Sequence, residues 1–487
     1  MKYATFYVGI LMLASCVQAQ SLEEQYNNFK RQAQNEYNDF RSKANLKYVE
    51  FIQEAWKQYK AYPAIPRPQD ENVQPVVMPE EDKNRHPIEN RPITIEDTVV
   101  VAPPKPKPQP VPLNPIKEQP KPKEAHICFV YLGTECEVRF NEDGKFSLTN
   151  CDNKTLASVW KRLSEQVYNN TVADCLKLRN RMRLCDWAYL NMLQVMAVAG
   201  LGEGNEAVLL AAFIYCQSGY KMRLGTVGNT LYLLYASEHT IYGQSYFEID
   251  GEKFYPFQCE EEQIRVCQAS FPKEQALSLQ IQQLPHLTNN RTTDRMLTSK
   301  RYPDVTVQVN VNKNLLDFYG TYPSSEIGGN FMTRWAMYAN VPLDTEVKEL
   351  LYPTLRAKIE GLTELDATER LLNFVQTAFV YEYDDKIWGH DRAFFAEETL
   401  YYPYCDCEDR SILFSRLVRD LLGLKVILVY YPGHLATAVC FTEEVKGDRI
   451  MLDGMPYVVC DPTFIGAPVG YTMTGMDNRT AKIVLLE

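Results

Sequence analysis

The sequence predicts an α+β protein in which helices precede antiparallel strands in two successive globular regions. In the first region, a helical pattern over residues 153–218 is followed by the strand-like segments TLYLLYAS, QSYFEID and EKFYPF, with Asp250-Gly251 as a turn between the last two. From Val341 to the end the order is the same, because helical patterns come first and alternating or buried strands come last. Between the regions, residues 260–300 are polar and Asp304–Asn312 alternates as a strand does.

The first 19 residues have the pattern of an export signal. One Lys precedes an apolar stretch, and Val17-Gln18-Ala19 ends it in a form that suits signal peptidase. We therefore expect a signal peptide over residues 1–19, cut before Gln20, and a periplasmic or secreted protein. In the alternative, Leu13-Ala14-Ser15-Cys16 resembles a lipobox, and Cys16 would then carry a membrane-anchoring lipid.

Residues 20–60 carry an eleven-residue repeat typical of an amphipathic hendecad helix. Aromatic residues recur at Phe29, Phe40 and Phe51, and small residues recur as an alanine row. A period of eleven keeps the apolar stripe on one face of a nearly straight helix. The stripe needs a surface to pack on, which is either the protein's own body or a partner. We expect a partner, by self-association or through another protein's helix across residues 22–60, and a body at 126–487 that folds without this helix.

Residues 61–125 are dense in proline and end in APPKPKPQPVPLNPIKEQPKPK. Such a segment favours extended polyproline geometry and buries no core of its own. It is predicted to be a semi-rigid linker.

Charge and cysteine content exclude several classes of partner. The net charge is -11, which disfavours nucleic acid because phosphate binding needs a basic face. No apolar run after the N-terminus is long enough to span a bilayer. The 13 cysteines show no zinc-ligand spacing with nearby histidines, so we expect no metal and no cofactor, and most cysteines are predicted to lie in the core.

A constellation near the C-terminus carries the chemistry. Cys407 is predicted to open a helix that ends at Gly423, where the helix dipole favours a thiolate and the nearby Glu408 and Asp409 oppose it. His434 follows a Pro-Gly turn and begins a strand, and Asp461 ends a later strand. A nucleophile on a helix, with a base and an orienting acid on neighbouring strands, is the arrangement of a Cys–His–Asp triad.

The motifs CED, GH and DPT, in this order, resemble those of the transglutaminase-like family, whose fold is related to that of papain-like cysteine proteases. The resemblance covers about residues 365–470 and implies a catalytic domain at 341–487. It also implies that Cys407 is the nucleophile, His434 the general base and acid, and Asp461 the residue that orients the imidazole.

Three further residues are candidates near this site. Cys405, two residues before Cys407, is a bystander, a redox partner or a rival nucleophile. For the oxyanion, the backbone N–H of Cys407 is one donor, and Tyr404 and Trp388 are candidate contributors or site-lining residues.

The middle region, residues 126–260, repeats the same order of elements without the chemistry. Aligned by its helix, Gly204 falls at Cys407 and Glu206 at Asp409, while Asn229-Thr230 falls near His434. No Asp in FYPF matches Asp461, and His239 is expected in a loop. We therefore predict a degenerate transglutaminase-like domain, joined to the catalytic one by a connecting region at 261–340.

The favoured function is that of an exported thiol enzyme acting on amide or peptide bonds of a protein or peptide substrate through an acyl-enzyme. By resemblance, a peptidase or amidase is favoured over a cross-linking transferase. The alternative is a non-catalytic scaffold that binds peptides.

Overall fold

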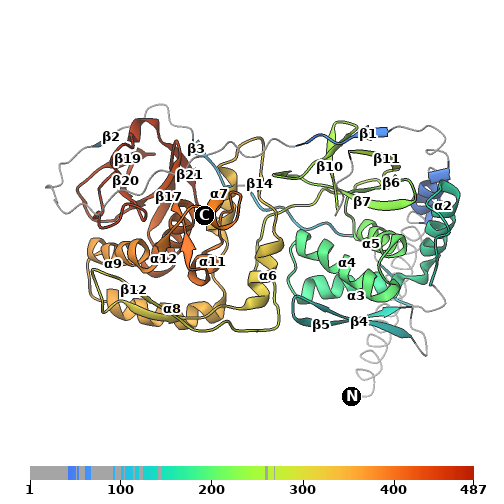
Figure 1. Ribbon diagram of the computed structural model, residues 1–487, viewed down its shortest axis with the longest axis horizontal. Coiled ribbons are helices and arrows are strands. Elements are labelled where there is room, and N and C mark those ends of the chain that lie inside the picture. Colours follow the sequence, from blue (N-terminus) through green and yellow to red (C-terminus); the bar gives the residue numbers. More distant parts are fainter. Residues whose placement is uncertain are drawn as a thin grey trace, which may run out of the picture.

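The computed structural model consists of two lobes that lie side by side, with helix α6 (Lys313–Thr321) between them (Figure 1). It describes residues 42–50, 52–53, 61–66, 92–93, 100–103, 105–112, 116–119, 124–140, 145–257, 262–267 and 269–487. We call residues 124–290 the middle lobe and residues 291–487 the C-terminal lobe. Both lobes mix helices with mainly antiparallel sheets, so the predicted α+β class is confirmed.

The middle lobe packs a helical layer against a six-stranded sheet. Its helices are α2 (Asn153–Arg162), a π-helical segment (Leu163–Val167), α3 (Asn169–Arg181), α4 (Asp186–Leu201) and α5 (Asn205–Gln217). The sheet order is β1-β11-β6-β7-β10-β9, and a separate hairpin of β4 (Ala125–Tyr131) and β5 (Thr134–Phe140) lies against the helices. The strands of the sheet are β1 (Ala61–Pro63), β6 (Met222–Val227), β7 (Thr230–Ala236), β9 (Phe247–Ile249), β10 (Glu252–Pro256) and β11 (Gln263–Cys267).

The C-terminal lobe surrounds one central helix, α12 (Cys407–Leu422), with a seven-stranded sheet on one side and helices on the other (Figure 1). The sheet order is β2-β19-β20-β18-β17-β21-β3, from β2 (Pro92–Ile93), β3 (Val100–Val101), β17 (Lys425–Tyr431), β18 (His434–Cys440), β19 (Arg449–Leu452), β20 (Met455–Cys460) and β21 (Lys482–Leu485). The remaining elements are β12 (Arg295–Thr298), β13 (Thr306–Val309), α7 (Thr333–Asn340), α8 (Thr345–Ile359), α9 (Glu364–Ala378), β15 (Val380–Tyr381), α10 (Asp384–Ile387), α11 (Ala396–Tyr401), β16 (Tyr404–Cys405) and a 3-10 turn (Asn478–Thr480).

The two large sheets share one topology. In chain order, β6, β7, β9, β10 and β11 take the same places as β17, β18, β19, β20 and β21, and every pairing between them is antiparallel in both lobes. In each lobe a helix, α5 or α12, directly precedes the first of these strands. The internal repeat expected from the sequence therefore has the strand order that it requires.

The boundaries of the two lobes differ from the expected ones. Strand β11 completes the middle sheet beyond residue 260, and the chain then follows the middle lobe as far as His286, whose N–H donates to Met182 O (2.7 Å). The hairpin β12–β13 and helix α7 pack on α8, α9 and α12, so most of the segment expected as a connection belongs to the C-terminal lobe. A short pairing of β8 (Thr240–Ile241) with β14 (Ser325–Glu326) joins the lobes.

The described part of the hendecad helix packs on the protein's own body, which corrects the expectation of a partner for residues 42–53. Tyr48 and Ile52 are buried, and the Tyr48 ring lies 4.6 Å from that of Trp160 and 4.7 Å from that of Phe271, centre to centre. Gln217 donates to Asn45 (3.1 Å). The stripe is covered here because the middle lobe offers an apolar surface of its own. The expected signal peptide and the first part of the repeat, residues 1–41, lie outside the described residues.

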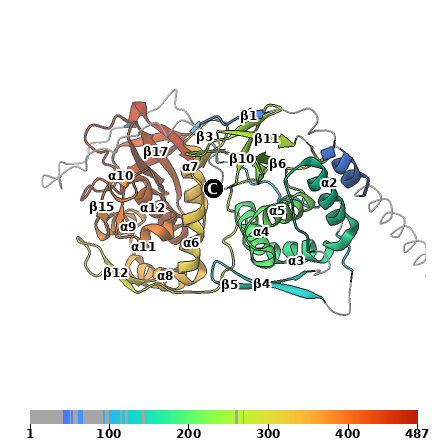
Figure 2. The same cartoon turned by 45° about the vertical axis from the view of Figure 1, so that its right-hand side comes forward.

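The proline-rich segment is not a free spacer where it is described. It pairs with the middle sheet at β1, with the C-terminal sheet at β2 and β3, and then returns to the middle lobe, where Arg179 donates to Pro110 O (2.9 Å) (Figure 2). Sheet edges carry unpaired N–H and C=O groups, and an extended segment satisfies them without a core of its own. The segment therefore ties the lobes together. Over the described residues, no helix combines the length and apolar character needed to cross a membrane.

Candidate active site

The N-terminus of α12 positions Cys407 at the first helical residue. Asp406 is the N-cap, and its backbone N–H donates to the Asp409 carboxylate (3.2 Å), which also accepts from the Phe394 N–H (2.8 Å). Asp409 thus fixes the helix start to the preceding loop. At the other end, Gly423 has a φ of 68°, a left-handed conformation that suits glycine and ends the helix as expected. Leu413 and Leu417 are fully buried in the core, which holds the helix in place.

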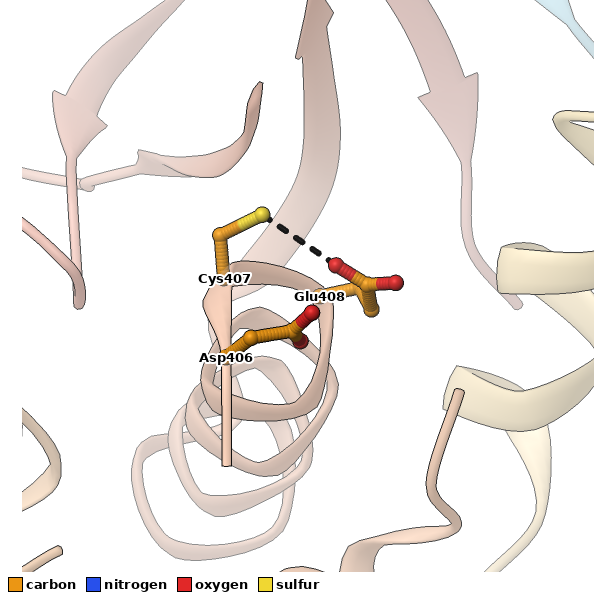
Figure 3. Close-up of side chains that lie close together, drawn as sticks. All are labelled: Asp406, Cys407 and Glu408. Carbon is orange, nitrogen blue, oxygen red and sulfur yellow. Dashed lines mark hydrogen bonds between the residues drawn. The ribbon is translucent and has the colours of Figure 1, made fainter. Parts of the chain in front are cut away.

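The thiol of Cys407 is buried and faces carboxylates. It is 5% exposed, and it donates to Oε2 of Glu408 (3.2 Å), as Figure 3 shows. The backbone N–H of Leu435 at the start of β18 also lies against it. Burial first, and then the charges of Glu408 and Asp406, hold the pKa of this thiol well above its usual value. The thiol is therefore protonated at neutral pH, and its ionisation needs a base or the removal of that charge.

His434 and Asp461 form a buried pair. The turn Pro432-Gly433 has the residue pattern of a type II turn, with a φ of 80° at Gly433, and His434 directly follows it. Nε2 of His434 lies 2.8 Å from Oδ2 of Asp461, and both side chains are 1% exposed. The other Asp461 oxygen accepts from the backbone N–H groups of Thr463 (2.9 Å) and Phe464 (3.2 Å). These bonds fix the carboxylate, and with Nε2–H donated to it, Nδ1 keeps the free lone pair of the neutral imidazole.

A cavity of about 590 Å³ opens beside Cys407 and His434, and both residues line it. Its other walls come from α6, α7, the loop that includes α10, the ends of β17 and β18, and Tyr242 of the middle lobe. The cavity thus lies between the lobes. Asp461 is not on the cavity wall and reaches it only through His434.

Cys405, Tyr404 and Trp388 lie outside the lining of this cavity. Cys405 is buried in β16, its sulfur accepts from Nε of Arg410 (3.5 Å), and burial raises its pKa to about 11. Tyr404 is 40% exposed on the surface. Trp388 packs its ring on Phe394 and Tyr402. The backbone donor that lies against the thiol is the N–H of Leu435.

A cluster of carboxylates on the cavity wall was missed by the sequence reasoning. Asp384, Asp391 and Glu408 each offer an oxygen within 4.8 Å of the others, and Asp406, Cys407 and Glu408 form a second such group. Burial and the charge of Glu408 raise the pKa of Asp384 to about 8, and burial and the same charge raise that of Asp406. These residues could hold a cation. The proximity of Asp406 and Glu408 to Cys407 follows from the sequence, whereas Asp384 and Asp391 come from a separate loop.

The middle lobe places other residues at the equivalent positions. Asn205 begins α5, and its Oδ1 accepts from Leu231 N–H (2.8 Å) at the start of β7, as Cys407 lies against Leu435 N–H. Thr230 begins β7 where His434 begins β18. Gly204 is the N-cap, so the expected match of Gly204 with Cys407 is wrong by one residue.

His239 lies in the short loop between β7 and β8, as expected, and is buried there. It is 1% exposed, its Nδ1 lies 3.2 Å from Ser325 Oγ, and its Nε2 accepts from Leu279 N–H (3.1 Å). Burial lowers its pKa to about 3, so the ring is neutral. It joins the lobes and has no part in the cavity.

Comparison with known proteins adds no relative: no protein family, no curated protein and no solved structure matches the chain.

Proposed function

We propose that the protein is a thiol acyl-transfer enzyme of transglutaminase-like fold, acting on amide or peptide bonds, with Cys407 as nucleophile. The observation that carries the proposal is the buried hydrogen bond, 2.8 Å long, between Asp461 and His434, which lines the same cavity as Cys407. A histidine held by a carboxylate next to a thiol at a helix N-terminus is the arrangement that thiol hydrolases use. The central helix and the strands that follow it also agree with the motif order CED, GH and DPT.

The residues support a two-step reaction. In the first step the Cys407 proton passes to Nδ1 of His434, the sulfur bonds to the amide carbon, and the C–N bond breaks as His434 returns the proton to the leaving amine. In the second step water, or an amine, attacks the thioester and frees Cys407. Asp461 holds the imidazole and stabilises its charged form. The thiol must leave Glu408 for this to begin, since its hydrogen bond is to that carboxylate.

Hydrolysis is the favoured outcome, and we propose that it takes place outside the cytoplasm. The export pattern of residues 1–19 supports the location. No disulfide joins the cysteines in the described part of the chain, and all of these except Cys128 and Cys440 are buried.

A second candidate function is a peptide-binding protein without turnover. One observation favours it: the pKa of the Cys407 thiol is raised by burial and by two carboxylates, which makes an unassisted thiolate scarce. The cavity between the lobes would then serve for binding alone.

Labelling with a thiol-directed electrophile separates the two functions. Cys128 is exposed and provides an internal reference for ordinary thiol reactivity. In the enzyme, Cys407 reacts faster than Cys128 despite its burial, and His434→Ala removes this advantage while Cys128 labelling is unchanged. Slow labelling of Cys407 that does not depend on His434 would support the binding protein. Incubation with periplasmic extract, followed by a proteomic search for new termini or isopeptides, then identifies the reaction.

A further inference from the structure

The charge on the cavity wall is unevenly balanced. Two of its carboxylates have arginine partners, Asp391 with Arg334 and Glu398 with Arg392. Three others near the thiol have no ion pair in the described structure: Asp384, Asp406 and Glu408. Asp384 accepts from a backbone N–H, that of Arg392 (2.7 Å), and Glu408 accepts the thiol. The wall beside Cys407 is therefore acidic, and the charge of Arg334 offsets burial and the charge of Glu408 at Asp384 only in part, because the pKa of Asp384 stays raised.

Asp406 shows that a donor is missing. It is 4% exposed, and its Oδ1 has no hydrogen-bond partner within the described residues. A buried carboxylate oxygen without a donor is costly, and native structures rarely leave one. Asp406 lines the cavity, and Figure 3 shows its carboxylate on the same side of the helix start as that of Glu408. The missing donor would have to enter from the cavity.

We propose that this acidic wall binds a protonated primary amine, so that the substrate class of the site is an amide with an ammonium group close to the reacting bond. An ammonium group has three N–H donors, and acceptors about 2.8 Å from its nitrogen stand about 4.6 Å apart. The oxygens of Asp384, Asp391 and Glu408 lie within 4.8 Å of one another, and the second group, with Asp406, shares Glu408 with the first. The naming of a substrate rests on the proposed function; the binding of an amine does not.

The rest of the cavity fits an organic cation better than a metal ion. Aromatic rings of Tyr322, Trp335, Tyr338 and Tyr430 line it, and its volume of about 590 Å³ is that of a site for a small organic ligand. Ring faces attract organic ammonium groups. An ion held by three carboxylates would leave these walls and most of this volume without a function.

Amine binding would also act on the nucleophile. Burial first, and then the charges of Glu408 and Asp406, raise the pKa of Cys407, and a cation between the two carboxylates would offset the second of these causes. The proton of Cys407 could then pass to His434. Binding of the correct substrate would thus make the thiol more reactive than it is in the empty site.

Calorimetry on the full mature chain carrying Cys407→Ala tests the binding without turnover. The probes are lysinamide, norleucinamide and N-acetyl-norleucinamide, which carry two, one and no ammonium groups on similar frames. We expect the two amines to bind at least tenfold more tightly than the acetylated probe. Adding Asp406→Asn should remove most of this difference and leave the acetylated probe unaffected. Glu444→Gln, at an exposed acid outside the cavity, is the matched control and should change nothing.

Equal binding of all three probes would overturn the proposal, and so would an undiminished preference for amines in Asp406→Asn. Binding of Ca²⁺ or Mg²⁺ alone that depends on Asp406 and excludes the amines would also overturn it, in favour of a metal site. Circular dichroism of each variant identifies loss of fold. If Asp406→Asn does not fold, the same binding experiment is carried out with Glu408→Gln, and the same loss of preference for amines is expected.

The native chain tests whether the amine belongs to the substrate. Peptide amides with a free amine should be cleaved at least tenfold faster than their acetylated forms. Acceleration of the acetylated forms by a separate amine such as norleucinamide would identify the amine as the second reactant instead. Equal cleavage of free and acetylated peptides would overturn the inference and leave the proposed function standing. Absence of all cleavage, with amine binding retained, would contradict the proposed function and leave the site as a binding site.

Discussion

The two lobes have the same sheet order but differ in the residues at one point of it. At the start of the helix and of the second strand, the middle lobe has Asn205 and Thr230 and the C-terminal lobe has Cys407 and His434. In both lobes the first helical side chain meets the N–H of the strand residue next to it, from Leu231 or from Leu435. The fold alone therefore creates a position where a side chain of the helix meets the sheet. Only the residue types determine whether that position can carry chemistry.

The largest expected difference between the lobes is in turnover. Cys407→Ala should lower the rate by about 10³-fold or more, because no nucleophile remains. Asn205→Ala should leave the rate unchanged and lower stability by about 1 kcal/mol through loss of its bonds to Leu231 and Asn229. Rates on the peptide identified from the extract, together with urea unfolding, measure both effects. If activity survived in Cys407→Ala and were lost in Cys405→Ala, the nucleophile would be Cys405, two residues earlier in the chain.

The second prediction concerns Asp461, the acid that is bonded to His434 in the C-terminal lobe. Asp461→Asn keeps an oxygen for the N–H groups of Thr463 and Phe464, but it offers an N–H to His434. Nε2 would then accept this N–H, and the imidazole proton would move to Nδ1, which no longer offers a lone pair to the thiol. We therefore expect kcat to fall about 10²- to 10⁴-fold with the fold intact. A variant as active as the native chain would show that Asp461 does not orient the histidine.

The third difference is in stability, because only the middle lobe receives the N-terminal helix. Tyr48→Ala removes a ring packed between Trp160 and Phe271 and should cost about 3 kcal/mol. Tryptophan fluorescence of Trp160 in urea would detect the loss. A chain beginning at residue 61 should show the same loss, and both should sediment as the native chain does. Unchanged stability together with a change in association state would restore the partner interpretation of this helix.

The smallest expected effect is on stability at acid pH, and it distinguishes the two buried histidines, His239 and His434. His239 has a pKa of about 3 when folded, against 6.5 for an ordinary histidine, because it is buried without a carboxylate. The unfolded chain then binds a proton that the folded chain does not. Stability present above pH 6.5 is therefore lost as the pH falls toward 3, by about 1.4 kcal/mol per pH unit at most. His239→Gln should flatten this slope in urea titrations between pH 6.5 and 4.5. An identical slope in the variant would assign the acid sensitivity to other groups.

The sequence located the elements of the site because they are local. The helix ending at Gly423, the turn at Gly433 and the strands after it follow from spacing alone, and each places one candidate residue. The acidic wall could not be found in this way, since Asp384 and Asp391 meet Glu408 only through the packing of a distant loop. The alignment error of one residue at Gly204 has a simple cause. Helix α5 has 13 residues and α12 has 16, so an alignment that matches the residues inside the two helices does not also match their first residues.

The N-terminal expectations failed for a physical reason that composition does not reveal. An apolar stripe on a helix indicates that another surface covers it, but it does not indicate which surface. Here Tyr48 packs on Trp160 of the same chain. Proline density correctly indicated an extended segment. It did not indicate that Val100 and Val101 would pair with β21, because backbone pairing at a sheet edge depends little on the side chains.

The tie formed by the proline-rich segment has a consequence for the order of events in folding. Residues 92–93 and 100–101 pair with β19 and β21, which lie more than 300 residues later in the chain. Strands β2 and β3 are synthesised long before β19 and β21, so they cannot pair until those later strands exist. Closing so long a loop is also slow. The C-terminal sheet can therefore gain both of its outer strands only after its own last strand has formed. Completion of the molecule is a late step, set by residues from both ends of the chain arriving at the same sheet.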